Sequence, residues 1–317
     1  MKKNSLYIFV LLIFWLFNSS NSYAQNNFWN DDFKLVQIPS SIDTVVQPAY
    51  FLDSKEKSNP LLVSLHTWSG DYTQADSLAY LAKNENWNYI HPNFRGPNNT
   101  KDACLSEKAI RDIDDAIQFS IENGNVDKNN IFIVGVSGGG YATLGMYLKT
   151  KYKIKSFLAW VPISDISAWY YQTKNRGLKY SQDILNCISG NNEFDENEAK
   201  RRSPLFWEIP QNLNGKLEIY AGIRDGYDGS VPITHSISFY NKITKAFGYE
   251  DKIVTEEEII KLLSREIVAD RSENKIDTRS ILYKRENPKV SLTIFDGKHE
   301  MLVNYCFDRI LQISELK

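Results

Sequence analysis

The sequence predicts an α/β fold in which about eight mostly parallel strands form a sheet flanked by helices. Two observations indicate this fold. Short segments rich in β-branched and aromatic residues alternate with segments of helical periodicity from residue 33 to the end of the chain. In addition, the apolar strand segment 131–136 runs directly into a glycine-rich turn and then into a helical segment. Parallel strands require such helix-length connections, which are almost always right-handed.

The expected strands follow in order along the chain. The first two are separated only by a short turn at Pro39, as in an antiparallel hairpin at the edge of a sheet. The later strands are separated by connections long enough for helices. The eight expected strands are residues 33–38, 45–52, 61–66, 87–92, 131–136, 156–161, 217–222 and 291–295.

Three helices are expected between these strands, and a fourth is expected after the last strand. In the first of them, Ala109, Ile113 and Ala116 recur at a spacing of three to four residues, with charged residues between them. Such a helix has one apolar face, which we expect to pack on the sheet. The four helices are residues 106–123, 139–150, 232–247 and 301–313.

Two stretches interrupt the alternation of strands and helices. Residues 164–213 are polar and aromatic, and we expect them to form a cap over the functional site. Residues 252–286 are charged, and Thr255 precedes three glutamates as an N-cap residue precedes an amphipathic helix. This second stretch is expected to be a mostly helical surface insertion.

The first residues have the order of a secretory signal peptide. Lys2 and Lys3 precede a 12-residue apolar run, residues 6–17, which is shorter than the roughly 20 residues of a transmembrane helix. Ser22 and Ala24 are the small residues expected at a cleavage site. We therefore expect residues 1–24 to be a signal peptide, and residues 25–317 to be an exported catalytic domain, periplasmic or secreted, without stable membrane association. The alternative is an uncleaved N-terminal anchor.

The composition restricts the partners of the protein. The chain of 317 residues has 37 basic and 39 acidic side chains and a formal net charge of −2. A nearly neutral chain has no electrostatic attraction to nucleic acid or to an anionic membrane. The expected partner is therefore a small molecule, an oligosaccharide or a peptide. No cysteine pair has the CxxC spacing of a zinc site, and neither a metal nor a cofactor is expected.

The turn after the strand 131–136 has the pattern of a nucleophile elbow, Gly135-Val136-Ser137-Gly138-Gly139. A serine on such a tight turn between a strand and a helix is exposed for attack, and its neighbours two residues away must be as small as glycine. Gly135 and Gly139 meet this condition. The context predicts the α/β-hydrolase fold with Ser137 as a nucleophile, whereas the alternative interpretation is a plain glycine-rich turn.

A serine nucleophile needs a histidine base and an orienting acid, which follow the serine in this fold. His299 follows the last expected strand and is the best candidate for the base. His66 and His91 precede the serine, and His235 lies in an expected helix. These three are interpreted as solvated or core histidines.

The acid is expected after the strand 217–222. Asp225 lies three residues beyond Gly222, where a carboxylate can reach the histidine Nδ1, and it is the favoured candidate. Asp228 lies deeper in the same loop and is the alternative acid. Asp296, which is close to His299 in sequence, is a weaker third candidate.

The negative charge of the tetrahedral intermediate requires two N–H donors. Gly138 supplies one because it follows the nucleophile. The second is expected from Thr67 or Trp68, in the loop after the third strand. In this fold a glycine commonly follows the histidine at the position of His66. Thr67 stands in its place here, which leaves the identity of the second donor open.

Several motifs together resemble the catalytic domain of the prolyl oligopeptidase family and its secreted bacterial relatives that act as carbohydrate esterases. They are the elbow at 135–139, the loop 225–232 and the segment 297–300, and residues 93–96 resemble the Asn-Tyr/Phe-Arg-Gly turn of that family. The likeness covers most of residues 50–315. Full prolyl oligopeptidases also carry a β-propeller, for which residues 25–32, between the expected signal peptide and the first expected strand, leave no room, so a different gate is expected.

The resemblance implies peptide or ester hydrolysis by Ser137, Asp225 and His299. In the short Asp-x-x-Val-Pro form of the family motif, Asp228 aligns in place of Asp225.

Aromatic residues of the expected cap and its surroundings, which can stack on sugar rings, favour an esterase that removes acyl groups from carbohydrate through an acyl-enzyme on Ser137. These residues are Trp160, Trp169, Tyr170, Tyr171 and Trp207. The alternatives are a prolyl oligopeptidase-like peptidase acting on short peptides and a binding module that has lost catalysis. The mature chain has three cysteines, Cys104, Cys187 and Cys306, which permit one disulfide without indicating its pairing.

Overall fold

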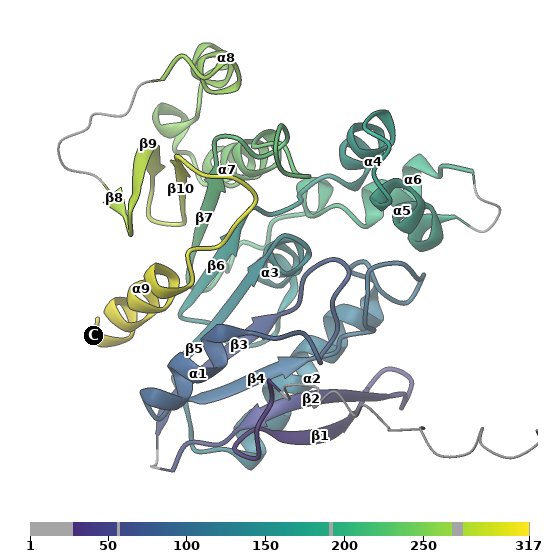
Figure 1. The fold of residues 1–317 in the computed structure, drawn as a ribbon, viewed down its shortest axis with the longest axis vertical. Coiled ribbons are helices and arrows are strands. Elements are labelled where there is room, and N and C mark those ends of the chain that lie inside the picture. Colours follow the sequence, from purple (N-terminus) through teal and green to yellow (C-terminus); the bar gives the residue numbers. More distant parts are fainter. Residues whose placement is uncertain (1–27, 56–57, 190–192, 268–274, 317) are drawn as a thin grey trace, which may run out of the picture.

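The computed structural model describes residues 28–55, 58–189, 193–267 and 275–316. The expected signal peptide, residues 1–24, lies outside the described residues. Within them the chain forms one sheet in the order β1-β2-β4-β3-β5-β6-β7-β10-β9-β8 (Figure 1). The strands are β1 (Lys34–Pro39), β2 (Val46–Leu52), β3 (Asn59–Leu65), β4 (Asn88–Pro92), β5 (Val126–Val136), β6 (Ser156–Trp160), β7 (Lys216–Gly222), β8 (Lys275–Ile276), β9 (Arg279–Glu286) and β10 (Val290–Phe295).

The centre of the sheet is parallel and its edges are antiparallel. β4, β3, β5, β6, β7 and β10 all run in the same direction. β1 and β2 form the expected antiparallel hairpin, and β2 is antiparallel to β4. All eight expected strands are present, and the predicted α/β-hydrolase fold is confirmed.

The prediction for residues 252–286 was wrong in part. The helix α8 (Glu256–Ser264) begins at Thr255 with a capping box that includes Glu258, as its sequence indicates. The end of the segment is not helical, because β9 pairs antiparallel with β10 and β8 pairs with β9. Ile281 and Tyr283 of β9 pack against the core, so this hairpin covers an edge that β10 would otherwise expose.

Helices cover both faces of the sheet (Figure 1). Apolar residues of α1 and α9 form one core cluster with one face, and those of α2, α3 and α7 form the other cluster with the opposite face. The expected helices are present, whereas the short helix α1, capped by Asp76, is an addition. The helices apart from α8 are α1 (Ser77–Asn84), α2 (Glu107–Asn123), α3 (Gly138–Lys149), α4 (Ile166–Asn175), α5 (Tyr180–Ile188), α6 (Glu196–Arg201), α7 (Thr234–Ala246) and α9 (Val303–Glu315).

The central strands are buried on both faces, which explains their continuous apolar sequences. In β3, Leu61 and Val63 belong to the core under α2 and α3, and Leu62 between them belongs to the core under α1 and α9. Side chains alternate between the two faces of a strand, so each face receives every second residue. This arrangement fixes the strand register and thereby the positions of the loops at the strand ends.

Residues 164–213 contain α4, α5 and α6 between β6 and β7, and we call their described part the insert (Figure 1). A disulfide between Cys104 and Cys187 joins α5 of the insert to the segment before α2, and Cys306 is a buried free thiol. Across the described ranges, no helix combines the length and the apolar character that spanning a bilayer would require.

Candidate active site

The candidate catalytic residues expected from the sequence lie in loops that follow the carboxyl ends of the strands. Ser137 directly follows β5, Asp225 lies in the loop after β7, and His299 lies in the loop after β10. β5, β6, β7 and β10 are consecutive parallel neighbours, so their carboxyl ends meet at the same edge. We call residues 66–70 the β3 loop, residues 223–232 the β7 loop and residues 296–302 the β10 loop.

Ser137 has the backbone geometry of a tight turn between a strand and a helix. Its φ of 59° and ψ of −116° place it in a region that non-glycine residues rarely adopt. Its N–H donates to the carbonyl oxygen of Trp160 at 2.9 Å, which anchors the turn to β6. A Cβ atom on Gly135 would lie 2.3 Å from the backbone of Gly139, and one on Gly139 would lie 2.1 Å from the carbonyl oxygen of Leu65. Glycine at both positions lets β5, α3 and β3 approach closely enough to form the turn.

His299 and Asp225 form a directly hydrogen-bonded pair. The Nδ1 atom of His299 lies 2.7 Å from Oδ2 of Asp225. The other carboxylate oxygen accepts hydrogen bonds from the N–H groups of Gly226 at 2.9 Å and Val231 at 3.0 Å. Asp225 is 2% exposed. A carboxylate at Nδ1 holds the imidazole in the tautomer that leaves Nε2 to accept a proton.

Ser137 and His299 are both described residues, and no hydrogen bond joins their side chains in this structure. Ser137 is 9% exposed and the His299 side chain is 21% exposed. Hydrogen bonds between catalytic groups are often longer in a free enzyme than in its substrate complex. The serine and the histidine therefore lie at the same edge of the sheet without a hydrogen bond between their side chains.

The two other acid candidates point elsewhere. The carboxylate of Asp228 is half exposed and lies 3.7 Å from Nε of Arg224 and 3.5 Å from Nζ of Lys298. Asp296 accepts a hydrogen bond from Arg224 at 2.7 Å. Neither carboxylate is hydrogen-bonded to His299.

The β3 loop distinguishes between the two candidates for the second N–H donor. The N–H of Thr67 already donates to Oε1 of Gln74 at 3.1 Å, and its hydroxyl donates to the same oxygen at 2.7 Å. The N–H of Trp68 has no acceptor among the described residues. It also lies beside the elbow, because a Cβ atom on Gly138 would be 2.3 Å from it. Gln74, a lone residue in a polar stretch, has no sequence signal that would have identified this role.

The remaining histidines are buried. Burial lowers the pKa of His66 to about 4 and that of His235 to about 3, and it also lowers the pKa of His91. His235 accepts hydrogen bonds at Nδ1 from the N–H groups of Ser164 and Asp165, which ties α7 to the start of the insert. These histidines are neutral structural groups of the core.

Most of the aromatic residues expected to stack on sugar rings are not accessible. Trp160 and Trp169 are completely buried, and Tyr170 is 4% exposed. Trp169 packs edge-to-face on Trp68 with ring centroids 4.6 Å apart, and its Nε1 donates to the carbonyl oxygen of Ser230 at 2.9 Å. This residue joins the insert to the β3 and β7 loops instead of offering a stacking surface. Trp207 is half-buried and donates to the carbonyl oxygen of Arg201, and Tyr171 is exposed.

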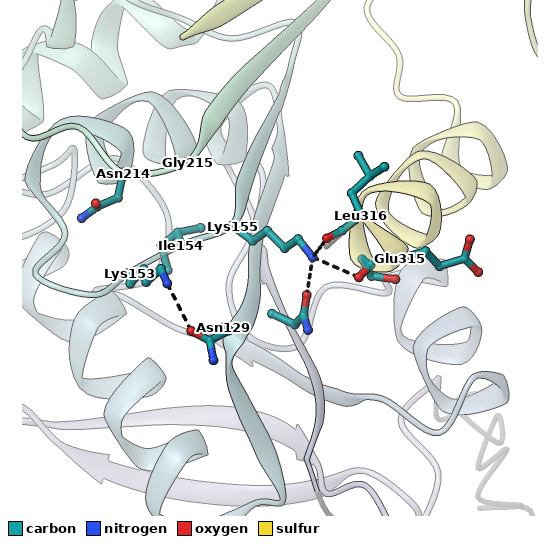
Figure 2. Close-up of a pocket in the computed structure, with 10 residues that line it drawn as sticks. Asn129, Lys153, Ile154, Lys155, Asn214, Gly215, Glu315 and Leu316 are labelled. Atoms are coloured by element: carbon teal, nitrogen blue, oxygen red, sulfur yellow. Dashed lines mark hydrogen bonds between the residues drawn. The ribbon is translucent and has the colours of Figure 1, made fainter. Parts of the chain in front are cut away.

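A cavity of about 530 Å³ lies at the amino-terminal ends of the central strands, the edge opposite to the candidate active site. Lys155, which precedes β6, and Gly215, which precedes β7, line it (Figure 2). The Lys155 ammonium is already bound by Asn130 and by the carbonyl oxygens of Ser314 and Leu316. None of the candidate catalytic residues lines this cavity. The cavity is therefore separate from the candidate active site.

Comparisons with known proteins identify the family of the chain. Residues 74–258, which include Ser137 and Asp225, match the model of the prolyl oligopeptidase family. A comparison with curated proteins finds no match.

Three solved structures illustrate the structural likeness. An acylaminoacyl peptidase of Pyrococcus horikoshii has a TM-score of 0.61 at 16% identity, with 89% of this chain and 40% of that chain covered. Prolyl oligopeptidase B of Galerina marginata has a TM-score of 0.56 at 15% identity, covering 90% and 36%. An esterase of Pyrococcus furiosus has a TM-score of 0.54 at 14% identity, covering 89% and 88%. The chain thus spans about two fifths of the length of the peptidases and most of the length of the esterase.

Proposed function

Because the chain belongs to the prolyl oligopeptidase family of serine hydrolases, we propose that Ser137, Asp225 and His299 form its catalytic triad and that it cleaves carboxylic esters through an acyl-enzyme on Ser137. The observation that carries the proposal is the 2.7 Å contact between His299 and the buried Asp225 at the sheet edge that holds the elbow serine. This contact favours Asp225 over Asp228 as the acid.

In this mechanism the hydroxyl of Ser137 attacks the carbonyl carbon of the ester while Nε2 of His299 takes its proton. Asp225 stabilises the imidazolium that forms. The N–H groups of Trp68 and Gly138 donate to the oxyanion, and removal of one such donor from comparable sites costs about 3 kcal/mol. His299 then returns the proton to the leaving alcohol. A water molecule, activated by the same histidine, releases the acid from Ser137.

Ester hydrolysis is favoured over peptide hydrolysis by the structural likeness along most of the esterase of Pyrococcus furiosus. The family match and the structural likeness to an acylaminoacyl peptidase support the alternative, a peptidase acting on short peptides. An acylated carbohydrate is the proposed substrate. Two exposed rings support it, Tyr227 in the β7 loop and Tyr171 in the insert, because an exposed ring can pack on the apolar face of a sugar.

We also propose that the protein is exported after removal of residues 1–24. The disulfide between Cys104 and Cys187 supports this location, because disulfides persist in oxidising compartments.

The test compares hydrolysis of p-nitrophenyl acetate with that of an aminoacyl-proline p-nitroanilide by wild type and by Ser137→Ala. We expect ester cleavage that decreases at least about a thousandfold in Ser137→Ala, with the anilide cleaved at least about a hundredfold more slowly than the ester. Ser264→Ala, which changes an exposed serine of α8, is the matched control and should retain full activity. Comparable anilide cleavage would favour the peptidase, and no Ser137-dependent cleavage of either substrate would contradict both.

A further inference from the structure

The connection between α4 and α5 brings one positive charge to each of two loops at the proposed active site. The guanidinium of Arg176 donates to the carbonyl oxygens of Gly229 at 2.8 Å and Tyr227 at 3.1 Å, both in the β7 loop. The ammonium of Lys179, three residues further on, donates to the hydroxyl of Ser69 at 2.8 Å in the β3 loop. Both cations are exposed, so a substrate can reach them.

Each contact lies next to a group that the proposed mechanism uses. A Cβ atom on Gly229 would be 2.5 Å from Cβ of His299 and 2.2 Å from Oδ1 of Asp225, so the residue that holds Arg176 touches the base and the acid. Ser69, which holds Lys179, directly follows the proposed oxyanion donor Trp68. The two cations therefore lie beside the loops that carry the base, the acid and the proposed oxyanion donor.

Neither cation is neutralised within the described chain. No described carboxylate lies within 4 Å of Arg176 or Lys179. The exposed acid of the β7 loop, Asp228, is shared between Arg224 and Lys298. The guanidinium of Arg265, without a described carboxylate partner, adds a further positive charge above the ring of Tyr227, 4.3 Å from its centroid.

Both groups are held in place and retain unused donors. Arg176 uses two of its five N–H donors on the β7 loop, and Lys179 uses one of its three on the β3 loop. Cations that are hydrogen-bonded to uncharged partners remain unpaired charges, which attract a negatively charged ligand. A guanidinium also matches the planar shape of a carboxylate.

We propose that Arg176 and Lys179 are specificity-determining residues and that the preferred esters carry a carboxylate near the scissile bond, as an acylated acidic sugar does. This inference rests on the ester hydrolysis proposed above and specifies the substrate class. The formal charge of the whole chain is −2, so a preference for anionic esters would not follow from its overall charge.

The test uses two matched pairs of esters at low ionic strength. 4-Acetoxybenzoate and 4-acetoxybenzamide differ by a charge on the alcohol side, and mono-4-nitrophenyl adipate and its terminal amide differ by a charge on the acyl side. We expect kcat/KM to be roughly tenfold higher for the carboxylate in at least one pair, since two partly exposed ion pairs together contribute about this factor. Added salt should reduce this preference.

Substitutions assign the preference to the two cations. Lys179→Gln and Arg176→Gln should each lower it about threefold, and the double variant should abolish it, with the amide substrates little affected. Arg176→Lys, which keeps the charge, should retain most of the preference and separates charge from any disturbance of the β7 loop. Lys200→Gln, with the same loss of charge on α6 but an ion pair to Glu196, is the control and should leave the preference unchanged.

Equal kcat/KM within both pairs would overturn the inference while leaving the proposed hydrolysis intact. A preference lowered equally by Lys200→Gln would also overturn it, because the effect would then come from overall charge. If none of the four esters is cleaved in a Ser137-dependent manner, the proposed function fails and this inference fails with it.

Discussion

At the scale of single residues, the backbone of the β7 loop determines which of two nearby aspartates contacts His299. The sequence places Asp225 and Asp228 three residues apart in one loop and cannot rank them firmly. Gly226 adopts a φ of +89°, and a Cβ atom there would lie 2.7 Å from Pro232, so the turn requires glycine. In this turn Asp225 faces inward to His299 while Asp228 remains exposed between two cations. The position of Asp225 near the end of β7 favours it in the sequence, and its contact with His299, 74 residues further along the chain, supports this choice.

The same selection leads to a prediction for the two aspartates. Asp225→Asn should lower kcat for p-nitrophenyl acetate by about four orders of magnitude, because an amide stabilises the wrong histidine tautomer and cannot stabilise the imidazolium. Asp228→Asn, the matched control, should change kcat no more than about twofold because its ion pairs are exposed. A larger loss in Asp228→Asn than in Asp225→Asn would contradict the assignment.

The buried histidines predict how stability depends on pH. The pKa is lowered to about 4 for His66 and about 3 for His235, whereas both have a pKa of about 6.5 in an unfolded chain. Between about pH 6.5 and 4 the unfolded chain binds more protons, so the free energy of unfolding decreases as the pH falls, by up to about 1.4 kcal/mol per pH unit for each histidine. Above about pH 7 both histidines are neutral in the folded and in the unfolded chain, so they do not make the free energy of unfolding depend on pH.

Urea unfolding of wild type and His235→Gln across this range measures the effect. The loss of stability on acidification should be smaller in the variant, because glutamine takes no proton. Parallel curves for the two proteins would show that His235 is not buried in its neutral form.

At the scale of elements, the sequence predicts the helices and strands that have a regular apolar pattern. It does not predict a strand or a buried side chain that depends on packing against a distant segment. The central strands are evident from their short continuous apolar runs, and α2 is evident from its helical apolar pattern. β9 was missed because its charged residues obscure the strand pattern, and only the free edge of β10 makes it a strand. Trp169 shows the same limit, since an aromatic cap residue and a core residue look alike in sequence.

The disulfide between α5 and the segment before α2 gives a prediction at this scale. Its cysteines are 83 residues apart, and the chain-entropy model assigns about 4.5 kcal/mol to a loop of this length. A Cys104→Ala, Cys187→Ala double variant should lose most of this free energy of unfolding, and Cys306→Ala, which removes a buried thiol, should lose about 1 kcal/mol.

Thiol titration checks the pairing itself. Unreduced protein should show no reactive thiol when native, since Cys306 is buried and burial raises its pKa, and one thiol when unfolded. Three thiols in unfolded, unreduced protein would contradict the bond.

At the scale of the whole molecule, the fold assembles the site from segments that are far apart in sequence. Ser137, Asp225 and His299 follow three different strands, and parallel pairing brings the ends of those strands to one edge. The insert then joins the β3 and β7 loops through Trp169 and places Arg176 and Lys179 against them. The order of serine, acid and histidine along the chain allowed the location of the site at the carboxyl ends of the strands to be predicted. The positions of Arg176 and Lys179 became evident only from the packing of the insert.

The most direct test of the central claim is labelling by a fluorophosphonate, which modifies only an activated serine, followed by peptide mapping. The proposed triad predicts one label on Ser137 of the wild-type protein, no label in Ser137→Ala, and labelling slowed at least about a hundredfold in His299→Ala. A label on another serine, or equal labelling of wild type and Ser137→Ala, would contradict the assignment of Ser137 as the nucleophile.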